Sequence, residues 1–118
     1  MREREKAMAP RCPFCEADLK RPEPMKTGDA EPVQGGTCFC GAIYLVDPTG
    51  KNVGIVMAQA LIFAADMLGK KVSDLDSDND YEDAVLSYDW RTHRSIGKVT
   101  GYMDGYGRLY VLKVKKTG

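Results

Sequence analysis

The longest apolar stretch of the chain lies near its middle and has the pattern of a helix. Residues 52–68, NVGIVMAQALIFAADML, are rich in Ala, Leu and Met, and a glycine follows as a C-terminal cap. Three polar residues within the stretch, Asn52, Gln59 and Asp66, are seven apart, so they form one narrow stripe and leave most of the circumference apolar. We therefore expect a helix over residues 52–69 that is buried on several sides, against β elements, a second copy of the chain or a partner protein.

Runs of β-branched and aromatic residues predict strands on both sides of this helix. AIYLV, at residues 42–46, is a short apolar strand that ends at the turn DPTG. Residues 81–90, YEDAVLSYDW, fit either a helical face or a strand, and we favour a strand because the segment that follows is β-like. That segment has two β-branched and aromatic runs around Asp104-Gly105, a strong local signal for a hairpin.

All four cysteines occur in two close pairs. CPFC places two residues between Cys12 and Cys15, and GGTCFCGAIYLV places one residue between Cys38 and Cys40. Zinc prefers four thiolate or imidazole ligands in a tetrahedron, and close pairs in tight turns supply two ligands each. Gly41, directly after the second pair, can take the backbone angles that such a turn requires. The spacing favours a structural zinc site, because four thiolates leave no open position for a catalytic water.

These residues resemble the zinc-ribbon superfamily, in which a CPxC knuckle, a connecting loop, a second cysteine pair followed by glycine, and a strand come in this order. The resemblance covers residues 12–46 and implies that the four cysteines are the metal ligands. The chain departs from the pattern twice: its second pair is CFC where CxxC is usual, and Glu16 stands where many ribbons have glycine.

Three other interpretations of the cysteines stay open. CPFC also occurs as a redox motif in glutaredoxin-like proteins, but that chemistry needs a strand before the motif and a helix that opens at it, and AMAPR supplies no strand. An iron centre of the rubredoxin type uses the same four-thiolate tetrahedron. Structural disulfides are the third. We favour zinc, with iron as the less favoured metal.

The predicted fold class is α+β, with a small N-terminal zinc ribbon, one central apolar helix and a C-terminal antiparallel β-hairpin or meander. The expected boundaries are a charged tail at residues 1–11, the ribbon at 12–50, the helix at 52–69, an acidic linker at 70–83 and a β subdomain at 84–118.

Charge is balanced over the whole chain, with 17 basic and 17 acidic residues, but it is unevenly distributed. Every charged residue between positions 72 and 89 is acidic, and basic residues dominate from position 90 onward. Four aspartates at positions 74, 76, 78 and 80 alternate like calcium ligands, but the glutamate that closes a calcium loop is absent, so a solvated linker is the better interpretation.

The chain begins with charged residues that do not read as a secretory signal, and its longest uncharged run is too short for a membrane helix. We therefore expect a cytoplasmic protein that does not enter the membrane. His93, the only histidine, has no cysteine or serine nucleophile near it in sequence, and no set of acid, base and nucleophile can be assembled. We expect no enzymatic activity.

Two functional hypotheses remain. The first is a zinc-stabilised protein-interaction module, an adaptor or accessory subunit, that binds a protein partner or forms a homo-oligomer through the apolar helix at Val53 to Leu68. The alternative is a nucleic-acid-binding protein, because the C-terminal β region interleaves basic and aromatic residues that could hold phosphates and stack bases. The basic residues are Arg91, Arg94, Lys98, Arg108 and Lys113, and the aromatic residues are Trp90, Tyr102, Tyr106 and Tyr110. Balanced net charge and the width of the apolar helix favour the first hypothesis.

Overall fold

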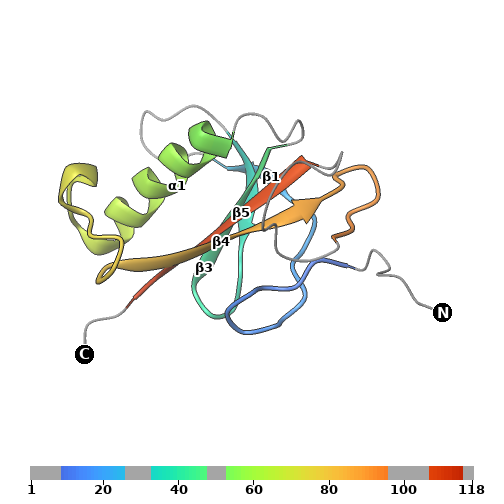
Figure 1. Ribbon diagram of the computed structural model, residues 1–118, viewed down its shortest axis with the longest axis horizontal. Coiled ribbons are helices and arrows are strands. Elements are labelled where there is room, and N and C mark those ends of the chain that lie inside the picture. Colours follow the sequence, from blue (N-terminus) through green and yellow to red (C-terminus); the bar gives the residue numbers. More distant parts are fainter. Residues whose placement is uncertain (1–8, 26–32, 48–52, 96–106, 116–118) are drawn as a thin grey trace.

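The computed structural model describes residues 9–25, 33–47, 53–95 and 107–115, and within them the fold is α+β (Figure 1). A five-stranded antiparallel sheet dominates it and carries one α-helix. The elements in chain order are β1 (Glu23–Met25), β2 (Val33–Thr37), β3 (Ala42–Asp47), α1 (Val53–Leu68), a short 3-10 helix η1 (Val72–Asp74), β4 (Tyr81–Tyr88) and β5 (Gly107–Val114). The predicted α+β class is confirmed, but in place of a separate C-terminal β-hairpin or meander one five-stranded sheet takes strands from both halves of the chain.

The strand order, β1-β2-β3-β5-β4, places the last strand of the chain between strands that precede it. β5 pairs antiparallel with β3 on one edge and with β4 on the other. Strands from the N-terminal and C-terminal parts of the chain therefore share one sheet. The expected hairpin turn at Asp104-Gly105 lies outside the described residues, and the described neighbours of β5 are β3 and β4. The strand interpretation is confirmed for residues 81–88, which form β4, while Asp89 and Trp90 belong to the turn that follows.

The central strands β3 and β5 are buried on both faces. Alternate residues point to opposite faces of a strand, so each of these strands serves two cores. Toward α1, the core is formed by Ile43, Leu45, Tyr110 and Leu112 of the sheet and by Val56, Ala60 and Ala64 of the helix. On the opposite face, Cys12 and Leu19 of the N-terminal segment pack on Ala42, Tyr44, Val46, Leu86, Tyr88, Leu109 and Val111.

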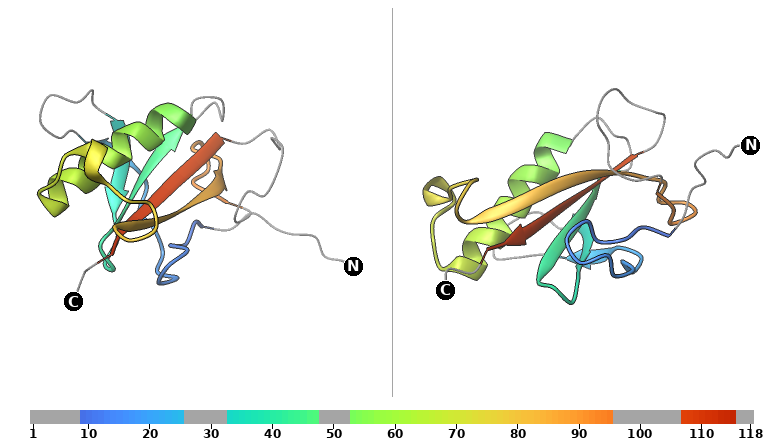
Figure 2. Two further views of the ribbon diagram at one scale, coloured as in Figure 1. Left: turned by 60° about the vertical axis from the view of Figure 1, so that its left-hand side comes forward. Right: turned by 60° about the horizontal axis from the view of Figure 1, so that its bottom comes forward.

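The two cores make a three-layer arrangement, with α1 across one face of the sheet and the N-terminal segment, residues 9–22, on the other (Figures 1 and 2). Small side chains at Ala60 and Ala64 let α1 lie close to the sheet. The helix is covered on one side only within the described part of the chain, since Ile55 and Ile62 on its outer face are 60% and 37% exposed. No helix among the described residues is long and apolar enough to cross a membrane.

Candidate metal centre

The first cysteine pair lies in a tight turn of the N-terminal segment. The Cys12 amide donates to the Ala17 carbonyl at 2.8 Å, and the Glu16 amide donates to the Cys12 carbonyl at 2.8 Å. A short antiparallel bridge between Arg11 and Asp18 flanks the turn. The turn thus closes a small hairpin that presents Cys12 and Cys15 on one side.

The second pair forms the turn between β2 and β3, and it repeats this arrangement with one residue fewer. The Cys38 amide donates to the Ala42 carbonyl at 2.8 Å, and the Gly41 amide donates to the Cys38 carbonyl at 2.9 Å. Phe39, at the tip of the turn, is 98% exposed. The shorter spacing of CFC is therefore matched by a hairpin turn that is itself one residue shorter.

Both pairs are followed by a residue with left-handed backbone geometry. Gly41 has φ +96°, a conformation that costs glycine little. Glu16 has φ +66°, and a side chain at this angle brings Cβ close to the following carbonyl oxygen. The position after the first cysteine pair is therefore a left-handed position in this chain, and Glu16 occupies it with strain.

The two turns bring the four sulfurs together. The distance from Cys12 Sγ to Cys40 Sγ is 3.7 Å and that from Cys15 Sγ to Cys38 Sγ is 3.4 Å. All four sulfurs lie within 4.8 Å of one another, and all four cysteines are free thiols. Sulfurs at about 2.3 Å from a tetrahedral metal ion would be about 3.8 Å apart. The cluster therefore has the dimensions of a four-thiolate metal site, and the prediction that these four residues could bind one ion is supported.

The two ends of the cluster differ in their surroundings. Burial raises the pKa of Cys12 to about 12, and it also raises the pKa of Cys38. At the exposed end, the Ala17 amide, followed by the Cys38 thiol, lowers the pKa of Cys15 to about 7. A buried thiol with a raised pKa is protonated at neutral pH, so a bound cation must displace protons from Cys12 and Cys38.

Tyrosine and histidine side chains of the sheet hold the N-terminal segment in place. The Tyr44 hydroxyl donates to the Lys20 carbonyl at 2.8 Å. His93 Nε2 lies 2.8 Å from the Leu19 carbonyl, which can only accept, so Nε2 carries the proton. His93 Nδ1 therefore accepts from the Tyr88 hydroxyl at 2.6 Å. Both ring nitrogens of the only histidine are engaged in tying β4 to the segment that bears the first cysteine pair.

The sequence alone assigned no role to His93, Tyr44 or Tyr88. The partner atoms explain why. His93 is 74 residues from Leu19 in the chain, and Tyr44 is 24 residues from Lys20. The sequence next to these side chains does not indicate that they form hydrogen bonds with such distant segments.

The basic residues proposed for nucleic-acid binding are spread over the molecule. Arg91 and Arg94 are exposed in the turn after β4, whereas Arg108 is only 5% exposed and its guanidinium donates to the Gly107 carbonyl. Lys113 is half-buried near the other end of β5, and Lys98 lies outside the described residues.

The aromatic residues of that prediction are separated as well. Tyr110 is buried toward α1, where its hydroxyl donates to Asp83 at 2.5 Å, while Trp90 is 51% exposed beyond β4. Tyr102 and Tyr106 lie outside the described residues. Of the described basic and aromatic residues, only Trp90, Arg91 and Arg94 share one exposed turn.

The alternating aspartates form a self-contained loop. The Asp80 carboxylate accepts from the Asp76 amide and from Lys70 Nζ, at 2.9 and 3.0 Å. The Asp76 carboxylate accepts from the Asp78 amide at 2.9 Å and from the Asn79 side chain at 2.7 Å. The Asp76 amide and Lys70 lower the pKa of Asp80. The carboxylates of Asp76 and Asp80 are thus used to fold the loop, but Asp80 is buried rather than solvated, and residues 81–83 of the predicted linker belong to β4.

Comparisons of the chain with protein-family models, with curated protein sequences and with solved structures found no match.

Proposed function

We propose that this protein is a zinc-stabilised protein-interaction module, an adaptor or accessory subunit without enzymatic activity. The observation that carries the proposal is the convergence of four cysteine sulfurs from two hairpin turns. Two knuckles that each present a cysteine pair, with left-handed geometry directly after each pair, are also what the resemblance to zinc ribbons leads one to expect. Four thiolates, with no oxygen or nitrogen ligand beside them among the residues that the structure describes, favour zinc over harder metals.

The role of the metal in this proposal is structural. Cys12 and Leu19 are buried against the sheet, so the metal ligands and the core on this face are parts of the same packing. A bound ion would join the N-terminal segment to the β2–β3 turn and so hold that segment against the sheet, where it covers this core. Binding of such an ion and folding of the segment would be one equilibrium. Engagement of both His93 nitrogens supports a role outside catalysis.

The outer face of α1 is the proposed interaction surface. Ile55, Ala58 and Ile62 lie on the side of the helix turned away from the sheet, and all three are exposed. They flank Gln59 and Asp66 of the polar stripe, so the face combines apolar contact area with a few polar groups. Such a face fits a second copy of the chain or a larger protein partner. We place the protein in the cytoplasm, where thiols stay reduced.

The first experiment is native mass spectrometry of the full chain, purified without oxygen or chelator. We expect one zinc ion per chain, and we expect Cys40→Ser to lose the metal and to unfold at least residues 12–50. Phe39→Ser is the matched control, because it changes the neighbouring exposed residue and leaves all four sulfurs in place. A Cys40→Ser variant with unchanged metal content and stability would refute the metal site. Iron in place of zinc would refute the choice of metal.

The interaction surface is tested separately. We expect Ile55→Glu together with Ile62→Glu to abolish self-association or partner binding, as measured by light scattering and by co-purification from the host. Val72→Glu is the control, because Val72 is 42% exposed but lies outside α1. A chain that stays monomeric at high concentration and co-purifies with no protein would remove this part of the proposal and leave the metal site untouched.

Nucleic-acid binding is the second candidate function, and one observation favours it. Trp90 is half exposed, and it lies beside Arg21 at the edge of a cavity.

A further inference from the structure

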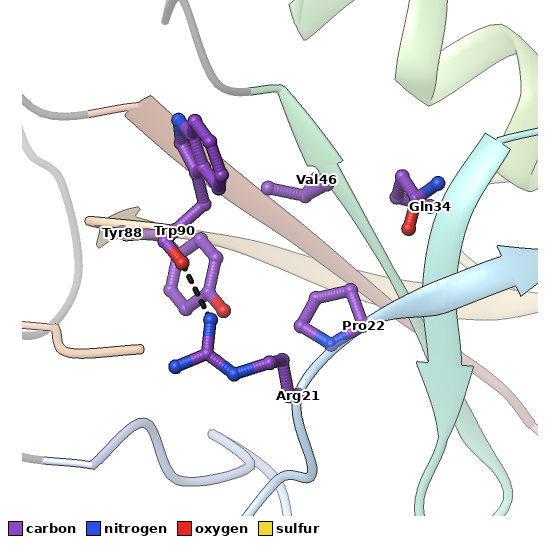
Figure 3. A pocket seen from close by; sticks show the side chains of 6 residues that line it. All are labelled: Arg21, Pro22, Gln34, Val46, Tyr88 and Trp90. Atoms are coloured by element: carbon purple, nitrogen blue, oxygen red, sulfur yellow. Dashed lines mark hydrogen bonds between the residues drawn. The ribbon is translucent and has the colours of Figure 1, made fainter. Parts of the chain in front are cut away.

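A cavity of about 460 Å³ lies on the face of the sheet that carries the N-terminal segment. Its lining comes from four parts of the chain that are distant in sequence (Figure 3). The lining residues are Arg21 and Pro22 from the segment before β1, Gln34 from β2, Val46 from β3, and Tyr88 and Trp90 from β4 and the turn after it. Its volume is within the range of small-molecule sites in proteins, roughly 300–1,000 Å³.

The cavity exists because the N-terminal segment covers only part of this face. Cys12 and Leu19 pack on this face of the sheet, and Arg21 and Pro22, a few residues further along the chain, line the cavity beside them. Arg21 Nη1 donates to the Trp90 carbonyl at 2.7 Å and thus joins the two rims of the cavity. The hydrogen bond sets the position of the turn that carries the indole.

The walls suit a flat ring. Pro22 and Val46 supply aliphatic surface, and the Trp90 side chain leaves about half of its surface open to solvent at 51% exposure. An exposed indole offers a stacking face to any planar ring system. Gln34 adds an amide with a donor and an acceptor, which can pair with the edge of a heterocycle.

The charge of the site suits an anion. Arg21 lines the cavity, and no acidic side chain does so among the residues that the structure describes. The Arg21 guanidinium has five N–H groups, of which one is used in the bond to Trp90. Arg91, the next residue after Trp90, is exposed, and within the described ranges its side chain makes no hydrogen bond or ion pair. Its backbone amide, by contrast, is held by Asp89 at 3.0 Å, which fixes the turn.

We propose that this cavity binds one unpaired base of a single-stranded nucleic acid, stacked on Trp90, with the adjoining phosphates bound by Arg21 and Arg91. A nucleotide suits this site, because its planar base fits the apolar walls and its negative phosphate fits the two arginines. A base within a duplex is stacked and paired, so it cannot enter the cavity, and the site selects single strands. The proposal rests on the second candidate function, and of the C-terminal residues expected from the sequence it uses only Trp90 and Arg91.

The single tryptophan makes the proposal directly testable. Titration of the full chain with oligo(dT) and oligo(U) should quench Trp90 fluorescence saturably, and a duplex of the same length should not. The affinity should fall as salt rises from about 50 to 200 mM, because phosphate contacts release counterions. Absence of saturable quenching, or equal quenching by duplex, would overturn the proposal. So would tighter binding of an acidic or proline-rich peptide, which would assign the cavity to a peptide.

Variants separate the stacking contribution from the phosphate contribution. Trp90→Ala, followed by anisotropy of a labelled oligo(dT), should weaken binding by about 5- to 150-fold, which corresponds to the loss of one stacked base. Trp90→Phe should retain most of the affinity.

Arg91→Ala should lower the slope of log affinity against log salt by about 0.7, the value for one phosphate contact to a single strand. Lys71→Ala is the matched control, because Lys71 is an exposed cation next to Lys70, which bonds Asp80 directly before β4, whereas Trp90 follows the other end of that strand. Equal effects of Arg91→Ala and Lys71→Ala would show that binding is only a response to surface charge.

Discussion

Glu16→Gly is expected to stabilise the protein, although it removes a side chain. Glu16 has φ +66°, and a non-glycine residue in this left-handed region costs roughly 1–2 kcal/mol. Glycine removes that strain but also makes the unfolded chain more flexible, which costs roughly 0.5–1 kcal/mol. The central values of these two ranges leave a net gain of about 0.75 kcal/mol in the free energy of unfolding.

The measurement is denaturant unfolding followed by circular dichroism, with free zinc held at the same excess for each variant, because a bound ligand shifts stability by mass action. Thermal unfolding should give a midpoint roughly 2–5 °C higher for Glu16→Gly in a chain of this size. The reverse change at the second knuckle, Gly41→Ala, should lose about 0.5–1 kcal/mol, because Gly41 has φ +96° and alanine offsets part of the strain by restricting the unfolded chain.

Glu16→Ala is the control that isolates the backbone. Alanine keeps the left-handed strain but removes the negative charge next to the thiolates, so the stability should change by no more than a few tenths of a kcal/mol. If Glu16→Ala gains as much stability as Glu16→Gly, the charge accounts for the effect and the reasoning from φ is refuted. If neither variant gains, the turn carries no strain at this residue.

Three further predictions follow from particular contacts. Asp80→Asn should destabilise the fold at neutral pH. The pKa of Asp80 is lowered in the folded state, so its contribution to stability is present above the unfolded pKa of about 3.9 and is lost as the pH falls through the folded-state pKa. The free energies of unfolding of the wild type and of Asp80→Asn should therefore converge in acid. Gly36→Ala should cost about 1–3 kcal/mol, because its methyl group would overlap the Tyr44 hydroxyl that holds Lys20, and unchanged thermal stability would contradict this. Zinc affinity, measured by chelator competition, should rise with pH near neutrality, because burial raises the pKa of Cys12 to about 12 and the ion must displace its proton.

Local patterns predicted the helix and three of the five strands, whereas β1 and β2 form within the segment that the sequence indicated as a connecting loop. The apolar run from Val53 to Leu68 forms α1, and the β-branched and aromatic runs form β3, β4 and β5. The spacing of the cysteines predicted a four-sulfur cluster, and the sulfurs do converge. These features depend on residues that are close in sequence, where periodicity and turn chemistry act directly.

The arrangement of the strands was less accessible. The sequence suggested that β5 would pair with the segment just before it, whereas in the structure β5 lies between β3 and β4. A signal was present, since AIYLV and LYVL are apolar at consecutive positions, which is typical of strands covered on both faces. Such runs indicate a central strand, but they do not say which neighbours it has.

The sequence by itself determined the α+β class, the position of the helix and the pairing of the cysteines into two turns, because each is encoded over a few residues. Only the tertiary structure decided that one sheet joins both halves of the chain, that His93 ties β4 to Leu19, and that Trp90 and Arg21 meet at a cavity. Arg108 and Tyr110 are buried in the structure, although the sequence predicted them to be surface residues that could bind nucleic acid. The physical reason is that these outcomes depend on which distant segments share a core. Burial of apolar surface drives that choice, but it is non-directional and leaves no local mark in the sequence.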